Sequence, residues 1–163
     1  MKSRISLTTI CLLGALFAAN SAVAQDTAPM TVTANVAPSC QLTNVETLAF
    51  GELDQSIDND AEADITWVCT SGFDTSIQID GGGSGSIVAR TMGGTGTLPY
   101  QLYTDAGRSL TFGDGSTGND VDVTGTGYGN PTTVTVYGRV TQADASAAVA
   151  GNYIDTVNVT ILF

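Results

Sequence analysis

Apolar and polar residues alternate along much of the chain, which is the pattern of β-strands with one buried face. The alternating apolar positions are Ile65, Trp67 and Cys69; Ile77 and Ile79; Leu98, Tyr100 and Leu102; Leu110 and Phe112; and Val134, Val136 and Val140. Glycine-rich stretches such as residues 81–85 and 125–131 separate them. Short strands joined by turns of this kind predict an all-β sandwich or barrel.

The stretch with the strongest β-forming composition lies near the last residue. A single strand is predicted there, and its one face carries Tyr153, Val157, Val159, Ile161 and Phe163. The one helix candidate is the alanine-rich stretch 142–150, which Gly151 follows. Because so short a helix is marginal in isolation, we predict a loop or a single turn there.

Another alternating stretch precedes the cysteines, and its apolar face carries Met30, Val32, Ala34 and Val36. This stretch and the final strand are long, apolar on one face and free of lysine. Soluble domains normally shorten, charge or cover such sheet edges, so we expect both segments to pair with another chain. The alternative is that residues 30–36 form an ordinary first strand of the same domain.

Residues 1–24 have the features of a secretory signal peptide. Lys2 and Arg4 precede an apolar run, and Ala22-Val23-Ala24 fits the small-residue cleavage pattern. We therefore predict an exported chain with an N-terminal extension over residues 25–37 and one domain over residues 38–163. No later stretch reaches the roughly 18 apolar residues of a membrane-spanning helix, so membrane insertion is not expected.

Export leaves Cys40 and Cys69 in an oxidising compartment, where disulfides persist. The alternative readings are two free thiols or a redox pair, and the spacing of a redox motif is missing. We predict one structural disulfide between them.

The charge of the exported part limits its partners. It carries all sixteen acidic residues of the chain against three arginines, Arg90, Arg108 and Arg139, a formal charge of −13. Nucleic acids and anionic membranes bind basic patches, so neither is an expected partner.

Candidate catalytic chemistry is sparse because the chain has no histidine, which excludes the common Ser-His-Asp and Cys-His arrangements. Paired carboxylates could hydrolyse glycosides, and Asp114, Ser116 and Asp120 could bind Ca²⁺. Residues 54–64 and 114–122 hold half of the sixteen acidic residues, however, and are predicted to be solvated loops. We expect no catalytic, cofactor or metal site, and no enzyme activity.

Several segments in order along the chain together form a recognisable pattern. They are Ser39-Cys40, Leu48-Ala49-Phe50-Gly51, Val68-Cys69-Thr70, Ile79-Asp80-Gly81-Gly82, Arg90-Thr91-Met92, Leu98-Pro99-Tyr100 and the closing Gly151-Asn152-Tyr153-Ile154-Asp155-Thr156-Val157-Asn158-Val159-Thr160-Ile161-Leu162-Phe163. The pattern resembles the spore coat protein U domain family, whose members include subunits of archaic chaperone-usher pili.

The resemblance implies an incomplete immunoglobulin-like β-sandwich, which a donor strand from a neighbouring subunit completes. The donor residues would be Met30, Val32, Ala34 and Val36, although Ala34 is small for this role. The acceptor groove and chaperone-binding edge would be formed by Val157, Val159, Ile161 and Phe163.

The partners that the resemblance implies are identical or related pilin subunits, a periplasmic chaperone and an outer-membrane usher. Head-to-tail insertion does not close on itself easily, so it yields filaments. The expected function is that of a pilin subunit in a cell-surface fibre for adhesion and biofilm formation. The alternative is a self-contained secreted coat or carbohydrate-binding module.

Overall fold

The structure is a computed structural model that describes residues 24–163, so the predicted signal sequence lies outside the described residues apart from Ala24. The chain divides into residues 1–34 and a compact unit over residues 35–163. Residues 24–39 form no helix or strand, and the first strand begins at Cys40. None of the helices in the described part is long and apolar enough to cross a membrane.

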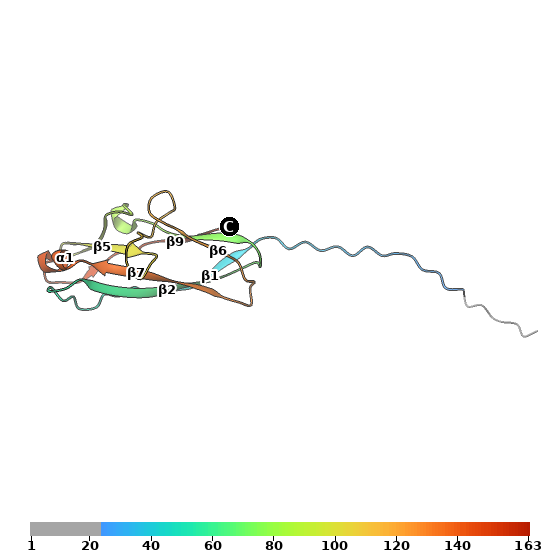
Figure 1. The fold of residues 1–163 in the computed structure, drawn as a ribbon, viewed down its shortest axis with the longest axis horizontal. Coiled ribbons are helices and arrows are strands. Elements are labelled where there is room, and N and C mark those ends of the chain that lie inside the picture. Colours follow the sequence, from blue (N-terminus) through green and yellow to red (C-terminus); the bar gives the residue numbers. More distant parts are fainter. Residues whose placement is uncertain (1–23) are drawn as a thin grey trace, which may run out of the picture. The chain divides into compact units, whose positions relative to one another are not determined.

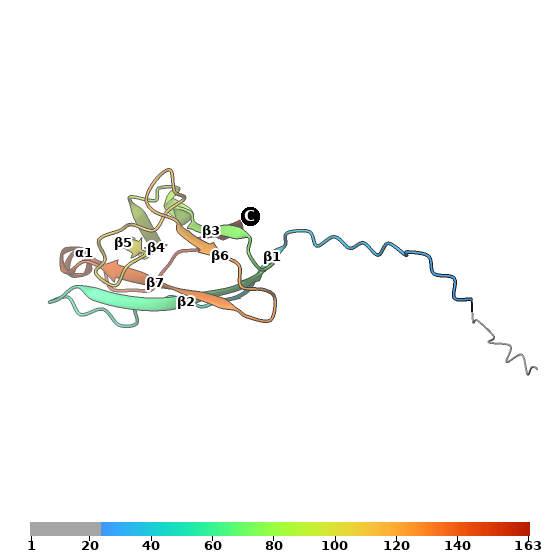
Figure 2. The same ribbon diagram turned by 45° about the vertical axis from the view of Figure 1, so that its right-hand side comes forward.

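Two antiparallel sheets make up the compact unit (Figure 1), as the alternating pattern predicts. The six-stranded sheet has the order β1 (Cys40–Val45), β2 (Asn59–Cys69), β7 (Thr132–Val140), β5 (Thr97–Tyr103), β4 (Arg90–Gly94) and β8 (Tyr153–Ile154). The three-stranded sheet has the order β6 (Val121–Thr124), β3 (Asp74–Ile79) and β9 (Val159–Leu162). Figure 2 shows β3 and β6 as a layer over β2 and β7.

The main core fills the space between the two sheets. Its buried residues are Ile65, Trp67, Cys69, Ile77, Ile79, Leu102, Phe112 and Val136. Seven of these eight alternate along β2, β3, β5 and β7 as the sequence predicts, so period-two patterning positions nearly the whole core.

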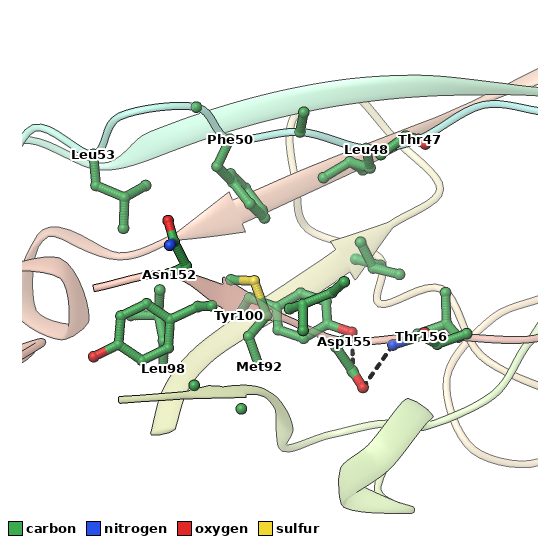
Figure 3. A pocket seen from close by; sticks show the side chains of 18 of the residues that line it. Thr47, Leu48, Phe50, Leu53, Met92, Leu98, Tyr100, Asn152, Asp155 and Thr156 are labelled. Atoms are coloured by element: carbon green, nitrogen blue, oxygen red, sulfur yellow. Dashed lines mark hydrogen bonds between the residues drawn. The ribbon is translucent and has the colours of Figure 1, made fainter. Parts of the chain in front are cut away.

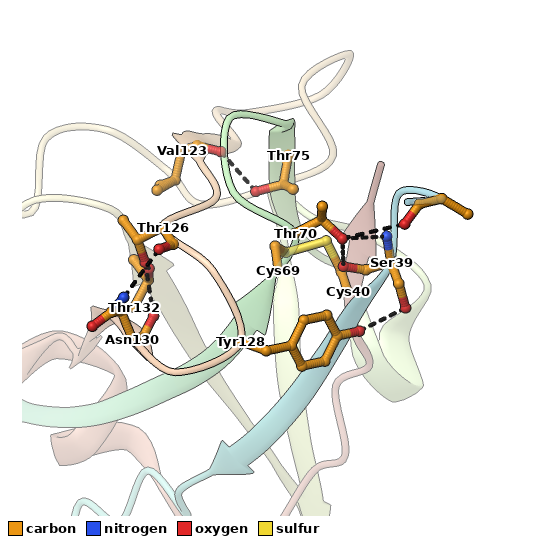
Figure 4. The surroundings of a disulfide bond; sticks show 11 residues. Ser39, Cys40, Cys69, Thr70, Thr75, Val123, Thr126, Tyr128, Asn130 and Thr132 are labelled. Carbon is orange, nitrogen blue, oxygen red and sulfur yellow. Dashed lines mark hydrogen bonds between the residues drawn. A yellow bond between two sulfur atoms is a disulfide. The ribbon is translucent and has the colours of Figure 1, made fainter. Parts of the chain in front are cut away.

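The Cys40–Cys69 disulfide is present, which confirms the predicted pairing. The two cysteines are register partners in β1 and β2, with a Cα–Cα distance of 4.1 Å. Figure 4 shows that the residue before Cys40 is also fixed: the Ser39 amide donates to Thr70 Oγ1 over 3.0 Å, and the Tyr128 hydroxyl donates to Ser39 Oγ over 2.6 Å. The start of β1 is therefore held by covalent and polar contacts.

Two local predictions differ from the structure. The strand predicted at Leu110 and Phe112 is absent: Thr111 and Phe112 form only isolated β-bridges, although Phe112 is fully buried. Residues Gln142–Ala147 form a helix, α1, instead of a single turn. The Thr141 side chain accepts a hydrogen bond from the Asp144 amide, and this N-cap satisfies one of the free amides of the first turn.

The predicted final strand is in fact two strands in different sheets. Gly93 of β4 pairs with Ile154 of β8, whereas Ile79 of β3 pairs with Val159 of β9. The prediction of one continuous strand was wrong because side-chain alternation continues through residues 155–158, where strand pairing stops. The predicted acidic loop over residues 54–64 was also partly wrong, since β2 begins at Asn59.

Reduction of the disulfide is expected to lower the free energy of unfolding by about 3 to 4 kcal/mol, because the Cys40–Cys69 bond closes a loop across a sequence separation of 29. Urea unfolding of the mature chain, with and without reductant, measures this through the fluorescence of Trp67, the single tryptophan. Equal unfolding midpoints under the two conditions would contradict the expectation.

Candidate functional site

A long groove separates two extended segments of the sandwich (Figure 3). One wall is formed by residues 45–55, which begin at the last residue of β1, and the other by residues 148–159, which include β8 and the start of β9. The floor is apolar and comes from Ala63, Ile65, Ile79, Leu98, Leu102 and Val136. The groove volume is about 1320 Å³, which is larger than the roughly 300–1,000 Å³ of a small-molecule pocket.

The first wall is attached to the sheet by two side chains that alternate with exposed residues. Leu48 and Phe50 are half-buried and lie over Gly138 of β7, where a Cβ atom would come within 2.7 Å of Leu48 Cδ2 and 3.0 Å of Phe50 Cζ. The Phe50 ring also packs edge-on against Tyr100, with 6.5 Å between centroids. Glycine at position 138 therefore permits the close approach of this wall.

The second wall presents alternate side chains to the groove. Asp155, Val157 and Val159 are half-buried and line it, whereas Thr156, which also lines it, and Asn158 are exposed to solvent. The side chains of Val157 and Val159 pack against the main core. The wall is thus continuous with the sandwich interior.

The outer edge of β9 has backbone groups that pair with no strand in the described part of the chain. The Asp80 amide donates to the Asn158 carbonyl over 3.2 Å, and the Ile79 amide points away from β9 to the Gly113 carbonyl over 3.0 Å. In an antiparallel ladder the direction of these groups alternates. The N–H and C=O groups of Val159 and Ile161 therefore point away from β3, toward the open edge.

A second apolar cluster lies at the end of the groove near α1. Leu98, Val140 and Ala145 are buried there, and half-buried Met92 and Tyr153 pack around them.

Polar contacts support the wall at Asp155 (Figure 3). The Tyr100 hydroxyl donates to Asp155 Oδ2 over 2.6 Å, and the amides of Gly83 and Thr156 each donate to Oδ1 over 2.8 Å. Burial, together with the hydrogen bond to the nearby Asp155 carboxylate, raises the pKa of the Tyr100 phenol. The Tyr100 hydroxyl therefore stays protonated and acts as a donor.

A second carboxylate supports the same wall. Asp80 Oδ1 accepts from the amides of Gly82 and Asn158 over 3.0 and 2.9 Å, and Oδ2 accepts from Asn158 Nδ2 over 2.6 Å. Burial opposes ionisation, but these hydrogen bonds and the charge of Arg90 hold the pKa of Asp80 below its ordinary value.

The Arg90 side chain is fully buried beneath this region. Its Nη2 donates to the carbonyls of Asp80 and Phe112 over 2.7 and 2.9 Å, and its Nη1 donates to Gln101 Oε1 over 2.6 Å. Because a buried guanidinium is costly unless its donors are satisfied, these contacts fix the positions of the surrounding chain segments.

The structure places the predicted site residues in different environments. Val157 and Val159 line the groove, and Ile161 packs against the core beside it. Phe163 does not line the groove and is 57% exposed, next to a shallow hollow on the three-stranded sheet. The side chains of Met30, Val32, Ala34 and Val36 are all exposed.

Sequence reasoning missed the opposite wall and its polar support. Leu48 and Phe50 appeared only as part of a family resemblance, although their i, i+2 spacing is a strand signal. Asp155 and Tyr100 had no local signal, because they are 55 residues apart and meet only through the sheet order. A contact between residues so far apart can be identified only from the tertiary structure.

The acidic residues considered as ligands have local structural roles. Asp114 Oδ1 accepts from the amides of Ser116 and Thr117, and Asp120 Oδ2 accepts from the Ser76 hydroxyl over 2.6 Å. The described residues contain no cluster of three or more metal-ligating side chains.

Comparison with known protein families gives a match to the Spore Coat Protein U domain over residues 26–160. The chain belongs to the spore coat protein U domain family. The matched region includes the alternating N-terminal stretch as well as the sandwich. A comparison with curated proteins finds no significant match.

A solved structure has a similar fold: the CsuC-CsuE chaperone-tip adhesion subunit pre-assembly complex from archaic chaperone-usher Csu pili of Acinetobacter baumannii. The TM-score is 0.55 at 19% identity, and the match covers 78% of this chain and 40% of that chain. The spore coat U domain of this chain therefore has an immunoglobulin-like sandwich fold, and it spans less than half of its structural neighbour.

Stability at acidic pH is expected to depend on Asp80. Its pKa is lowered from 3.8 in the folded state, so the ionised carboxylate stabilises the fold above that value, and this contribution is lost as the pH falls through the folded-state pKa. Asp80→Asn should be less stable than wild type at pH 7, and the difference should narrow below about pH 4.

Urea unfolding between pH 2.5 and pH 7 measures this dependence. Asp122→Asn is the matched control, because the Asp122 carboxylate accepts no hydrogen bond from the described residues, and it should follow the wild-type profile. If the difference in unfolding free energy between Asp80→Asn and wild type stays constant with pH, the ionised Asp80 carboxylate is not the source of the stabilisation.

Proposed function

We propose that this spore coat U domain protein is a structural subunit of a chaperone-usher pilus, exported through the periplasm and polymerised by donor-strand exchange into a surface fibre for adhesion and biofilm formation. The observation that carries the proposal is the open groove beside the unpaired edge of β9. Residues 25–36 of a second copy are the proposed occupant.

The chemistry of the N-terminal stretch matches that of the groove. Met30 and Val32 are 82% and 81% exposed, and together with Ala34 and Val36 they form a row of alternate apolar side chains. In β conformation, all four would point to one side, toward an apolar floor. Burial of each larger side chain is worth roughly 1.5 to 3 kcal/mol.

The backbone of the incoming strand would add hydrogen bonds to this burial. The outward N–H and C=O groups of Val159 and Ile161 offer a ladder for an extended segment. The row of apolar side chains gives specificity for the groove. The backbone hydrogen bonds of the ladder add affinity that does not depend on side-chain identity. Because each copy carries both elements, insertion of one copy into the next generates a filament.

The same edge accounts for the other proposed partners. An exposed strand edge next to an apolar groove is prone to unwanted pairing. A periplasmic chaperone would cover it before assembly, and an outer-membrane usher would exchange the chaperone for the next subunit. In this proposal the protein is a building block and performs no catalysis.

Substitution within the N-terminal stretch tests the proposal. Val32→Asp introduces a charge on the face that enters the groove, and we expect it to abolish assembly of the mature chain, because burial of an unpaired carboxylate costs several kcal/mol. Thr33→Asp adds the same charge one residue further, on the opposite face, and should still assemble. Size-exclusion chromatography and unheated gel electrophoresis report the assemblies.

Heat-dissociable ladders from wild type and Thr33→Asp, but not from Val32→Asp, are the expected result. If all three chains are stable monomers, the protein is a self-contained secreted module, such as a coat or carbohydrate-binding protein. If both variants assemble like wild type, the N-terminal stretch is not the donor.

A further inference from the structure

The segment Asp155–Asn158 forms part of one groove wall without belonging to either sheet. It lies between β8, which pairs with β4, and β9, which pairs with β3, and it has no strand pairing of its own. Asp155, Thr156 and Val157 all line the groove. Apart from the backbone hydrogen bond between the Asp80 amide and the Asn158 carbonyl, contacts other than a sheet ladder must fix this wall in position.

Side-chain hydrogen bonds hold the segment at both ends. At the first end, the Asp155 carboxylate binds the Tyr100 hydroxyl and the amides of Gly83 and Thr156. At the other end, the Asp80 carboxylate binds the amide and side chain of Asn158. The wall is thus attached to β5 and to the turn after β3.

The turn after β3 is itself rigidly supported. Arg90 donates through Nε and Nη2 to the Asp80 carbonyl over 2.9 and 2.7 Å, and through Nη2 to the Ile79 carbonyl over 3.2 Å. Gly82 has a φ of 58°, and a Cβ atom at this position would collide with the Asp155 carboxylate. Backbone and carboxylate are therefore in close contact.

We propose that Tyr100 and Asp155 are positioning residues that hold the groove wall in a strand-accepting arrangement before any strand enters. The inference rests on the proposed function, because it concerns the same groove. Tyr100 also lies at the groove floor and packs against Phe50 of the opposite wall, so one side chain contacts both walls. A preformed acceptor reduces the ordering that the incoming strand must impose, and this favours fast association.

The first test is amide hydrogen exchange of the full mature chain carrying Val32→Asp, which keeps the groove free of donor. Tyr100→Phe removes only the hydroxyl, and it should raise the exchange rates of the Gly83 and Thr156 amides about tenfold, as expected for loss of a hydrogen bond to a charged group. The amides of Gly82 and Asn158, held by Asp80, should change little. Unchanged exchange at Gly83 and Thr156 would overturn the proposal.

Tyr103→Phe is the matched control, since Tyr103 is half-buried in the same strand and its hydroxyl makes no hydrogen bond with the described residues. It should leave all four amides unaffected. If Tyr100→Phe also raises amide exchange throughout β2, the substitution destabilises the whole domain. In that case exchange of the same four amides is measured in Asp155→Asn instead. Loss of amide protection throughout the domain in both variants would overturn the positioning role.

The second test adds a synthetic peptide of residues 26–36 to the same proteins. Tyr100→Phe should reduce the association rate constant about tenfold and leave the dissociation rate constant within about twofold, whereas Tyr103→Phe should match the parent protein. Equal association rates in all three would overturn the positioning role. Failure of the peptide to bind the parent protein would contradict the proposed function, and the exchange result would still stand.

Discussion

The unpaired edge of β9 is the feature on which the other properties of this protein depend. Backbone N–H and C=O groups are obligatory hydrogen-bonding groups, and a sheet edge beside an apolar surface is a site of strand addition. Here the groups of Val159 and Ile161 point to the open edge of β9, and Val159 also lines a groove whose floor is continuous with the core. The sandwich therefore presents a backbone ladder and an apolar surface together, which is the combination that a strand with alternating apolar residues can use.

A network of polar contacts holds the groove walls in place, and it contains a single cationic side chain, Arg90. Arg90 is the one buried cation of the described chain, and it donates to the carbonyl of Ile79, at the end of β3, and to the carbonyl of Phe112. Asp80 and Asp155 then extend the network to the segment that changes sheets.

Much of the sandwich could be predicted from period-two alternation, because side-chain burial in β2, β3, β5 and β7 follows the pleat of the strands. The prediction of a continuous strand through residues 155–158 was wrong for a physical reason. Side-chain alternation indicates which face of a strand is buried, but it does not indicate which neighbouring strand supplies the hydrogen bonds. Phe112 is another example, because its side chain is fully buried although its backbone forms only an isolated β-bridge. The short helix α1 was underestimated because the Thr141 cap and its packing against β5 supplement a weak intrinsic preference.

The groove was predictable only in part. Val157 and Val159 were recognisable from their spacing, but the opposite wall depends on Gly138, which makes space for Leu48 and Phe50 across the sheet. The contact between Tyr100 and Asp155 depends on the order of the strands. Sequence patterns therefore located one side of the groove, while its width, its floor and its polar support arise from tertiary packing.

The measurement that most directly tests the central claim is residue-resolved hydrogen exchange along β9 in monomeric and assembled protein. We expect the outward amides of Val159 and Ile161 to exchange freely in the monomer and to become protected in the assembly, while those of Thr160 and Leu162, which face β3, are protected in both. If Val159 and Ile161 exchange equally in both states, β9 gains no strand on assembly, and the account is contradicted.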